Sequence, residues 1–283
     1  SGTEAPAEFN VFIAPEKTLL AAEIATCSLH NILTPRGAKV RDARAWAHYL
    51  DEAVTRYGPR SETVISSHCW PIFGRAEGTA WLTAQRDNYR YLHDQTVRRM
   101  NRGETMAEIA EGLALPGELG QEWATHGYYG TYSHNAKAIY QYYLGWYDAV
   151  PANLNPHPPV ERAKKLIEAL GGAERVLALA ENAMAAGDYR WSSDLLSQVV
   201  FADAANQTAR ALLADSYEQQ GYQAESAIWR NQFLAAAGDL RGKSAAGSAA
   251  QSNDIIAALA TQELLDSAAT RFAPERAAPR GFN

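Results

Sequence analysis

Apolar residues near the start of the chain gather in two short runs with turn chemistry between them. The runs are FNVFIA (9–14) and TLLAAEIA (18–25), and both are rich in β-branched, aromatic and aliphatic residues. The PEK that separates them is typical of a tight turn. The pattern predicts a β-hairpin over residues 9–25, and the later run ETVISSHCW predicts a short strand over 62–70.

Helical spacing of apolar residues follows the hairpin. Asp42 stands where a helix N-cap belongs, Trp46, Leu50 and Val54 recur every four residues, and Gly58 ends the pattern. These positions predict a helix between Asp42 and Gly58. Further helices are predicted over 77–103, 105–115, 133–148 and 254–272.

The third of these further helices, over residues 133–148, is expected to begin at a capping Ser133. Its apolar spacing places Ile139, Tyr143 and Trp146 on one side. The proline-rich AVPANLNPHPPVE (149–161) has no periodicity and is the best candidate for a linker within the chain.

An internal repeat follows that linker. LAENAMAAGDY (179–189) aligns with LADSYEQQGYQ (213–223) at an offset of 34 residues, which matches Leu179 with Leu213, Ala180 with Ala214, and Gly187 with Gly221. This period is typical of tetratricopeptide (TPR) helix pairs, so the sequence predicts a TPR-like repeat over residues 179–235. A chance match within an alanine-rich helical bundle is the alternative. The segment 241–253 has low complexity.

Composition and charge exclude several classes of protein. The 283 residues are 47% hydrophobic and 20% charged, enough for two domains with cores of their own. A net charge of -6 without a basic cluster argues against a nucleic-acid partner. No stretch approaches the ~18 consecutive apolar residues that predict a transmembrane segment. Cys27 and Cys69 are too few for a disulfide framework or a cysteine-based zinc site, and are either paired or free.

Candidate chemistry lies in GTEAPAE, AAEIATCSLHNILTPRG and ISSHCWPIFG, which follow or precede predicted strands and offer Glu4, Glu8, Glu23 and His68. Glu23 interrupts an apolar run, and burying an ionised carboxylate costs several kcal/mol without a cation beside it. Either Glu23 lies on an exposed strand face, or a cation or metal neutralises it. His68 is either a structural histidine or a ligand. Carboxylates and imidazoles suit zinc.

Five motifs in one order carry a family resemblance: GTEAPAE, HNILTPRGAKVRDA, SSHCWP, GYYGTYSHNAKAIYQYYLGWYD and PANLNPHPP. Together they resemble the alkyl sulfatases of the metallo-β-lactamase superfamily, the dodecyl-sulfate-hydrolysing type, from residue 1 to about residue 275. The resemblance implies an α/β part of a metallo-β-lactamase αββα sandwich followed by an all-α, TPR-like helical domain. We therefore expect the C-terminal portion of the catalytic domain at 1–100, the dimerisation domain at 101–270, and a linker toward a further C-terminal domain at 271–283.

The resemblance also implies two zinc ions at the active site. Glu4, Glu23 and His68 match metal ligands of the family, whereas Glu8 has no such match and is expected to be an ordinary polar residue. The family's His-x-His-x-Asp-His motif is absent from this chain, so the remaining ligands are expected outside it. The chain is then expected to be a piece of a longer polypeptide, one product of a cleaved enzyme, or an incompletely determined sequence.

For the sulfate group, the resemblance implies contacts from Asn31 and Arg36. A planar guanidinium and an amide donor suit a sulfate monoester. His30 is implied as a catalytic group that donates a proton or hydrogen bond to the leaving sulfate, and Tyr140 as a phenolic donor. From the residues alone, the alternative for Arg36 is a loop arginine paired with a carboxylate, and the alternative for Tyr140 is a core aromatic.

The expected function is zinc-dependent hydrolysis of alkyl sulfate esters to alcohol and inorganic sulfate. The alternatives are another hydrolase of the same superfamily and a non-catalytic helical-repeat dimerisation module. Expected partners are an alkyl sulfate, a second copy of the chain, and the N-terminal half of the catalytic domain. The residues leave the compartment unknown, although the resemblance points to a periplasmic or secreted protein.

Overall fold

The structure is a computed structural model that describes residues 2–243, 257–270 and 272–273. The chain divides into two compact units, Ser1–Gly242 and Lys243–Asn283. Within the second unit, helix α12 spans Thr261–Ala269, inside the helix predicted over 254–272. Most of the low-complexity segment 241–253 and of the predicted linker 271–283 lies outside the described residues.

A small mixed sheet opens the first unit. Its strands lie in the order β1-β2-β3-β4, with antiparallel pairing of β1 with β2, parallel pairing of β2 with β3, and antiparallel pairing of β3 with β4. The strands are β1 (Val11–Ile13), β2 (Thr18–Leu20), β3 (Thr63–Ile65) and β4 (Ile72–Phe73). The predicted hairpin is confirmed. The strand predicted over 62–70 ends at Ile65, and strand β4 was not predicted.

The register of the sheet sorts its apolar residues into two faces. Phe12 pairs with Leu19, Leu19 with Val64, and Val64 with Ile72, so one row of side chains crosses the whole sheet toward the core. On the opposite face Val11 pairs with Leu20, and Leu20 with Ile65. We call Val11, Leu20 and Ile65 the outer row. Val11 and Ile65 are exposed.

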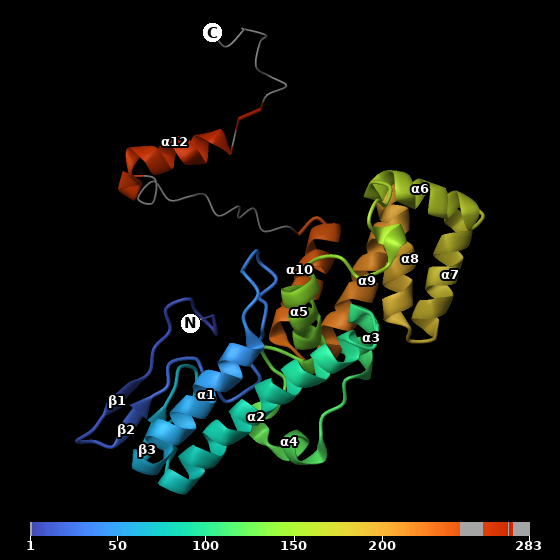
Figure 1. Ribbon diagram of the computed structural model, residues 1–283. Helices are drawn as coiled ribbons and strands as arrows, with labels where there is room; N and C mark the ends of the chain where they lie inside the picture. The colour runs from blue at the N-terminus through green and yellow to red at the C-terminus, as the bar shows by residue number, and fades with distance from the viewer. Residues whose placement is uncertain (1, 244–256, 271, 274–283) are drawn as a thin grey trace. The chain divides into compact units, whose positions relative to one another are not determined.

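Two long helices cover the inner face of the sheet and lie side by side in Figure 1. They are α1 (Ala43–Tyr57) and α2 (Arg75–Met100). As predicted, Asp42 caps α1, because its Oδ1 accepts hydrogen bonds from the backbone N–H groups of Arg44 and Ala45, each at 2.9 Å. Trp46 and Leu50 face the core at zero exposure.

The remaining helices of the first unit are α3 (Met106–Gly112), α4 (Gly117–Gln121), α5 (Tyr132–Leu144), α6 (Pro159–Ala169), α7 (Ala173–Ala185), α8 (Tyr189–Ala202), α9 (Gln207–Gln223) and α10 (Ala227–Leu240). Short 3-10 turns lie at η1 (Gly58–Arg60), η2 (Trp123–Thr125) and η3 (Pro151–Asn153). Among the described residues, no helix is both long and apolar enough to cross a membrane.

Helix α5 differs from its prediction at both ends. Thr131, and not Ser133, is the N-cap, because its hydroxyl accepts a hydrogen bond from the backbone N–H of His134 at 3.0 Å. The helix ends at Leu144, so Trp146 lies beyond it and is exposed. Tyr143 is also exposed, and Ile139 alone of the three predicted positions is buried.

Helices α7 to α10 contain the predicted repeat. Consecutive helices contact one another, and the matched pair Ala180 and Ala214 is fully buried in both copies. Gly187 adopts a φ of 78° in the turn between α7 and α8. Its counterpart Gly221 lies inside α9 against Leu234, so the two copies differ at this position. These helices share a second core, built around Val176, Leu196 and Ala209.

The main core of the first unit includes residues on both sides of the domain boundary predicted at residue 100. Tyr132 and Ile139 of α5 belong to the same apolar cluster as Leu19, Trp46 and Tyr89. The boundary itself stays a prediction. For the site, the consequence is that α5 and the segment before it are packed directly against the strand-and-helix part of the chain.

Candidate active site

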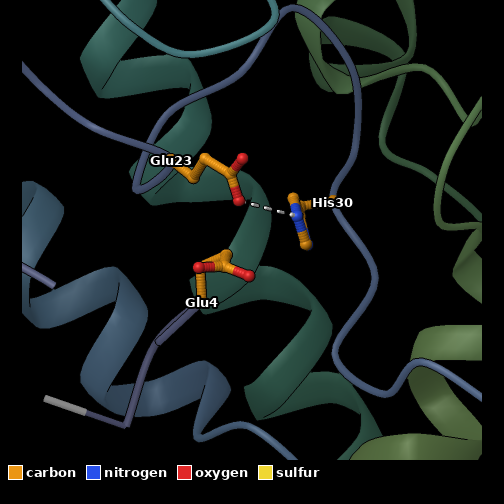
Figure 2. Close-up of side chains that lie close together, drawn as sticks. All are labelled: Glu4, Glu23 and His30. Atoms are coloured by element: carbon orange, nitrogen blue, oxygen red, sulfur yellow. Dashed lines mark ion pairs between the residues drawn. The ribbon is translucent and has the colours of Figure 1, made fainter. Parts of the chain in front are cut away.

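Three ligand-type side chains converge at one end of the sheet. Glu4 lies in the turn before β1, Glu23 in the turn after β2, and His30 in the irregular segment that leads to α1. One ligand atom from each lies within 4.8 Å of the others, and Figure 2 shows Glu23 and His30 turned toward one another with Glu4 beside them. The three residues form the group that we call the Glu-Glu-His cluster.

The hydrogen bonds of His30 define its tautomer. Its Nδ1 lies 2.9 Å from the carbonyl oxygen of Asn31, which accepts only, so Nδ1 carries the proton. In the neutral ring Nε2 then holds a lone pair, and this atom lies 3.9 Å from Oε2 of Glu23. His30 is 6% exposed, and burial lowers its pKa to about 4. At neutral pH His30 therefore offers the cluster a lone pair and no proton.

Glu23 has two further partners. Its Oε1 contacts Nε2 of His68, the histidine that the sequence predicts as a ligand. Its backbone N–H donates to Oε1 of Glu8 at 2.7 Å, and the other Glu8 oxygen accepts from the Thr3 hydroxyl at 2.7 Å. Glu8 is thus more than an ordinary polar residue, because it fixes the backbone on which Glu23 sits.

A disulfide lies beside the cluster and settles the state of the two cysteines. Cys27 and Cys69 are bonded, with their Cα atoms 5.6 Å apart and a separation of 42 positions in sequence. Cys69 follows His68, whose φ of 64° is unusual for a residue other than glycine. The bridge therefore attaches the His68 turn to the segment that links Glu23 with His30.

These residues line a cleft of about 770 Å³. Polar and charged lining comes from Glu4, Glu23, Thr26, Ser28, His30, Arg36, His68 and His126. The aromatic lining comes from Trp123, Tyr128 and Tyr129, of which Trp123 and Tyr128 are largely exposed. One part of the wall is thus charged and another is apolar, which suits an amphiphilic ligand.

The aromatic wall reaches the cleft because two distant segments pair closely. The backbone N–H of Leu29 donates to the carbonyl of His126, and the N–H of Gly130 donates to the carbonyl of Leu29, both at 2.8 Å. A Cβ at Gly130 would lie 2.6 Å from the carbonyl oxygen of His30, so only glycine allows this approach. Tyr129 then packs edge-on against the His30 ring, with centroids 4.8 Å apart. Sequence reasoning missed both tyrosines of this wall.

The residues predicted to bind sulfate occupy three different environments. Arg36 is exposed and lines the cleft. Asn31 is fully buried and is not among the residues that line the cleft, and its Nδ2 has no hydrogen-bond partner among the described residues. Tyr140 is 1% exposed and belongs to another apolar cluster, with Ile109. Its assignment to the substrate needs correction, because the core of the helical part encloses its ring away from the cleft.

A buried histidine holds the loop that carries Arg36. Nε2 of His134 donates to the carbonyl of Leu33 at 2.5 Å, and Nδ1 accepts from the indole N–H of Trp229 at 2.9 Å. Both ring nitrogens are thus satisfied in one neutral tautomer. Burial lowers the pKa of His134, and the nearby Lys137 acts in the same direction.

We expect His134 to make the folded state sensitive to mild acid. Its pKa is lower in the folded than in the unfolded chain, so the unfolded chain binds this proton first as the pH falls below about 6.5. The stability that the neutral ring contributes is therefore present above that pH and lost below it. Urea unfolding at about pH 7.5 and about pH 5.5 should show a smaller acid destabilisation in His134→Gln than in the wild type. An equal loss in both proteins would contradict this role.

Comparison with known proteins identifies relatives over most of this chain. Residues 105–243 match the family described as alkyl sulfatase dimerisation. Over 240 residues, 85% of the chain, the sequence is 49% identical to the alkyl/aryl-sulfatase BDS1 of Saccharomyces cerevisiae. It is 48% identical over 241 residues to an (R)-specific secondary-alkylsulfatase of Pseudomonas sp.. The chain is an alkyl sulfatase homologue.

The structural likeness extends over almost the whole of this chain. The stereoselective inverting sec-alkylsulfatase Pisa1 from Pseudomonas sp. superposes with a TM-score of 0.92 and 44% sequence identity, over 97% of this chain and 43% of that one. This chain spans 37% of the length of the yeast enzyme and 36% of the length of the Pseudomonas secondary-alkylsulfatase. It thus contains the dimerisation region and only part of what those enzymes carry.

Proposed function

We propose that the chain forms part of a zinc-dependent enzyme that hydrolyses alkyl sulfate esters to alcohol and inorganic sulfate. The observation that carries the proposal is the Glu-Glu-His cluster, which opens onto a cleft shared by the exposed Arg36 and an aromatic wall. Such a cleft suits a substrate with one anionic and one apolar end. The alkyl sulfatases among the relatives support the same substrate class.

The donor set fits zinc. Glu4 and Glu23 supply carboxylate oxygens, and the Nε2 lone pair of His30 adds a nitrogen donor within 4.8 Å of them. His68, in contact with Glu23, is the further ligand. Zinc, when bound here, would supply Lewis-acid activation of water and of a sulfate oxygen. The resemblance to the metallo-β-lactamase superfamily implies two ions and further ligands from outside this chain.

The chain's own residues have separate parts in the reaction. Arg36 has no carboxylate partner among the described residues, so its guanidinium can hold two sulfate oxygens. Nε2 of His30 serves as the zinc donor described above, so no proton transfer is assigned to this atom, and the predicted proton or hydrogen bond from His30 to the leaving sulfate stays a prediction. The Nδ2 donor of Asn31, five residues before Arg36, has no partner among the described residues and would be the amide donor to the sulfate. The aromatic wall excludes water and packs on the alkyl chain.

Two partners complete this proposal. A second copy of the chain would bind through the region that matches the dimerisation family. The N-terminal half of a metallo-β-lactamase-like catalytic domain would cover the outer row of the sheet, where Val11 and Ile65 are exposed. The helix pairs α7 to α10 would then act as a TPR-like layer of the dimerisation domain.

Substitution of Glu23 tests the proposal. The purified full chain is dialysed, its zinc content is measured by elemental analysis, and sulfate release from dodecyl sulfate is followed. Zinc binding should fall by more than about 100-fold in Glu23→Gln, because losing a ligand should exceed the 10–100-fold cost of losing an outer-shell partner. Glu16→Gln, an exposed glutamate in the β1–β2 turn, is the matched control and should leave zinc content unchanged.

A substrate panel separates the alternatives. Release of sulfate without release of phosphate or carboxylate from matched alkyl esters supports the sulfatase, and the reverse favours another hydrolase. If the wild-type chain retains no zinc and releases no sulfate while sedimenting as a dimer, the non-catalytic dimerisation module replaces the hydrolase. The match of residues 105–243 to the dimerisation family is the observation that keeps this second candidate.

A further inference from the structure

Arg41 lies between the Glu-Glu-His cluster and the loop that carries Arg36. It is the last residue but one before α1, and it is 9% exposed. An arginine is rarely buried to this extent unless each side of its guanidinium meets an acceptor. The acceptors around Arg41 come from Glu4 and from the segment Asn31–Thr34, which lie almost thirty residues apart in sequence.

On one side the guanidinium binds Glu4. Nε donates to the backbone carbonyl of Glu4 at 2.9 Å, and Nη2 donates to its carboxylate Oε1 at 3.0 Å. The two bonds fix both the backbone and the side chain of Glu4. Because the ion pair is mostly shielded from solvent, this restraint is stronger than that of a surface pair.

On the other side the guanidinium binds the loop. Nη1 donates to the backbone carbonyl of Asn31 at 3.0 Å and to its side-chain Oδ1 at 2.6 Å. A longer contact of 3.3 Å reaches the hydroxyl of Thr34. Since Arg41 can only donate, Oδ1 and not Nδ2 of Asn31 must face it. Arg41 therefore sets the amide of Asn31 so that its NH2 group is the unused donor.

We propose that Arg41 is a positioning residue that holds Glu4 and the Asn31–Thr34 loop in one fixed relation. The proposal rests on the proposed function, because it assigns these two segments to metal and sulfate binding. The rigid fork of the guanidinium is essential to this role. A lysine ammonium is a single point charge and cannot contact acceptors on both sides.

Backbone hydrogen bonds also join these segments, and they define the competing explanation. The N–H of Arg41 donates to the carbonyl of Ile32 at 2.9 Å, and the N–H of Asp42 donates to the carbonyl of Gly2 at 2.7 Å. If these bonds alone hold the segments, removal of the guanidinium will leave their amide exchange unchanged.

Hydrogen exchange followed by mass spectrometry tests the proposal without zinc or turnover. In Arg41→Lys and Arg41→Gln of the full chain, peptides covering residues 2–8 and 29–36 should both exchange faster, while peptides of α7 to α9 keep wild-type rates. Arg44→Gln, an exposed arginine in the first turn of α1, is the control and should change neither peptide. The proposal is overturned if either peptide is unaffected, if exchange rises throughout the chain, or if lysine restores wild-type exchange in both segments.

Zinc affinity gives a second readout. Competition with a chromophoric chelator should show about 10- to 100-fold weaker binding in Arg41→Lys, the usual cost of losing an outer-shell partner of a ligand. If the wild type binds zinc and Arg41→Lys binds it with the same affinity, Arg41 does not position a zinc ligand. A wild-type chain that binds no zinc would count against the proposed function, whereas the exchange experiment would still decide whether Arg41 joins the two segments.

Discussion

Replacing Trp46 by alanine should lower the free energy of unfolding by about 3–5 kcal/mol, the range typical of large aromatic truncations in a core. Trp46 has zero exposure, and its ring stacks on Tyr89 with centroids 4.7 Å apart. Its indole N–H also donates to the carbonyl of Ile24 at 2.7 Å. The alanine variant would therefore leave both a cavity and a buried carbonyl without its donor.

Trp46→Phe separates these two contributions. Phenylalanine keeps a ring to stack on Tyr89 but has no donor for Ile24, so it should cost about 1–3 kcal/mol, the penalty for an unsatisfied buried acceptor. Urea unfolding followed by far-ultraviolet circular dichroism measures all three proteins by one signal that does not depend on this tryptophan. Equal losses in the two variants would contradict the importance of the packed ring.

Loss of the disulfide should have an effect of similar size. Closing a loop of 42 residues in the unfolded chain corresponds to about 4 kcal/mol in the chain-entropy description. Cys27→Ser with Cys69→Ser should therefore lower the unfolding midpoint strongly, and reduction of the wild type should have the same effect. The bridge also holds the turn of His68, so the double variant should bind zinc more weakly.

The controls for this prediction come from the same variant. Since it has no disulfide, its unfolding curve should not respond to reductant, whereas that of the wild type should. Two reactive thiols in the folded, unreduced wild type would show that the bridge does not form. A double serine variant as stable as the oxidised wild type would contradict the stabilising role.

The sequence predicts well those features whose causes are local. Helix α1 follows from a capping aspartate, four-residue spacing and a terminal glycine, all within seventeen residues. Strand β3 stops early because the chain turns at His68 in a left-handed conformation and is attached to Cys27. That attachment is a tertiary contact, and no pattern of neighbouring residues reports it.

In the site, too, residues with local signals could be predicted and residues placed by tertiary contacts could not. Glu4, Glu23 and His68 could be selected because they are ligand-type residues beside predicted strands, whereas His30 was selected only through the family resemblance. Tyr140 was assigned wrongly because helical spacing identifies a buried face but not the cavity or core that it meets. Tyr129 escaped notice because its place depends on Gly130 packing against His30, a hundred residues away. The positioning role of Arg41 likewise depends on acceptors that only folding brings together.

The outer row of the sheet links the stability of this chain to concentration. Any molecule that covers Val11, Leu20 and Ile65 binds the folded chain and not the unfolded one. It therefore raises the free energy of unfolding by RT ln(1 + [L]/Kd), where [L] is its free concentration. The melting temperature should rise with the amount of whatever covers this face, and dilution should lower it. A thermal melt of this chain is thus also a binding curve for any partner that covers the outer row.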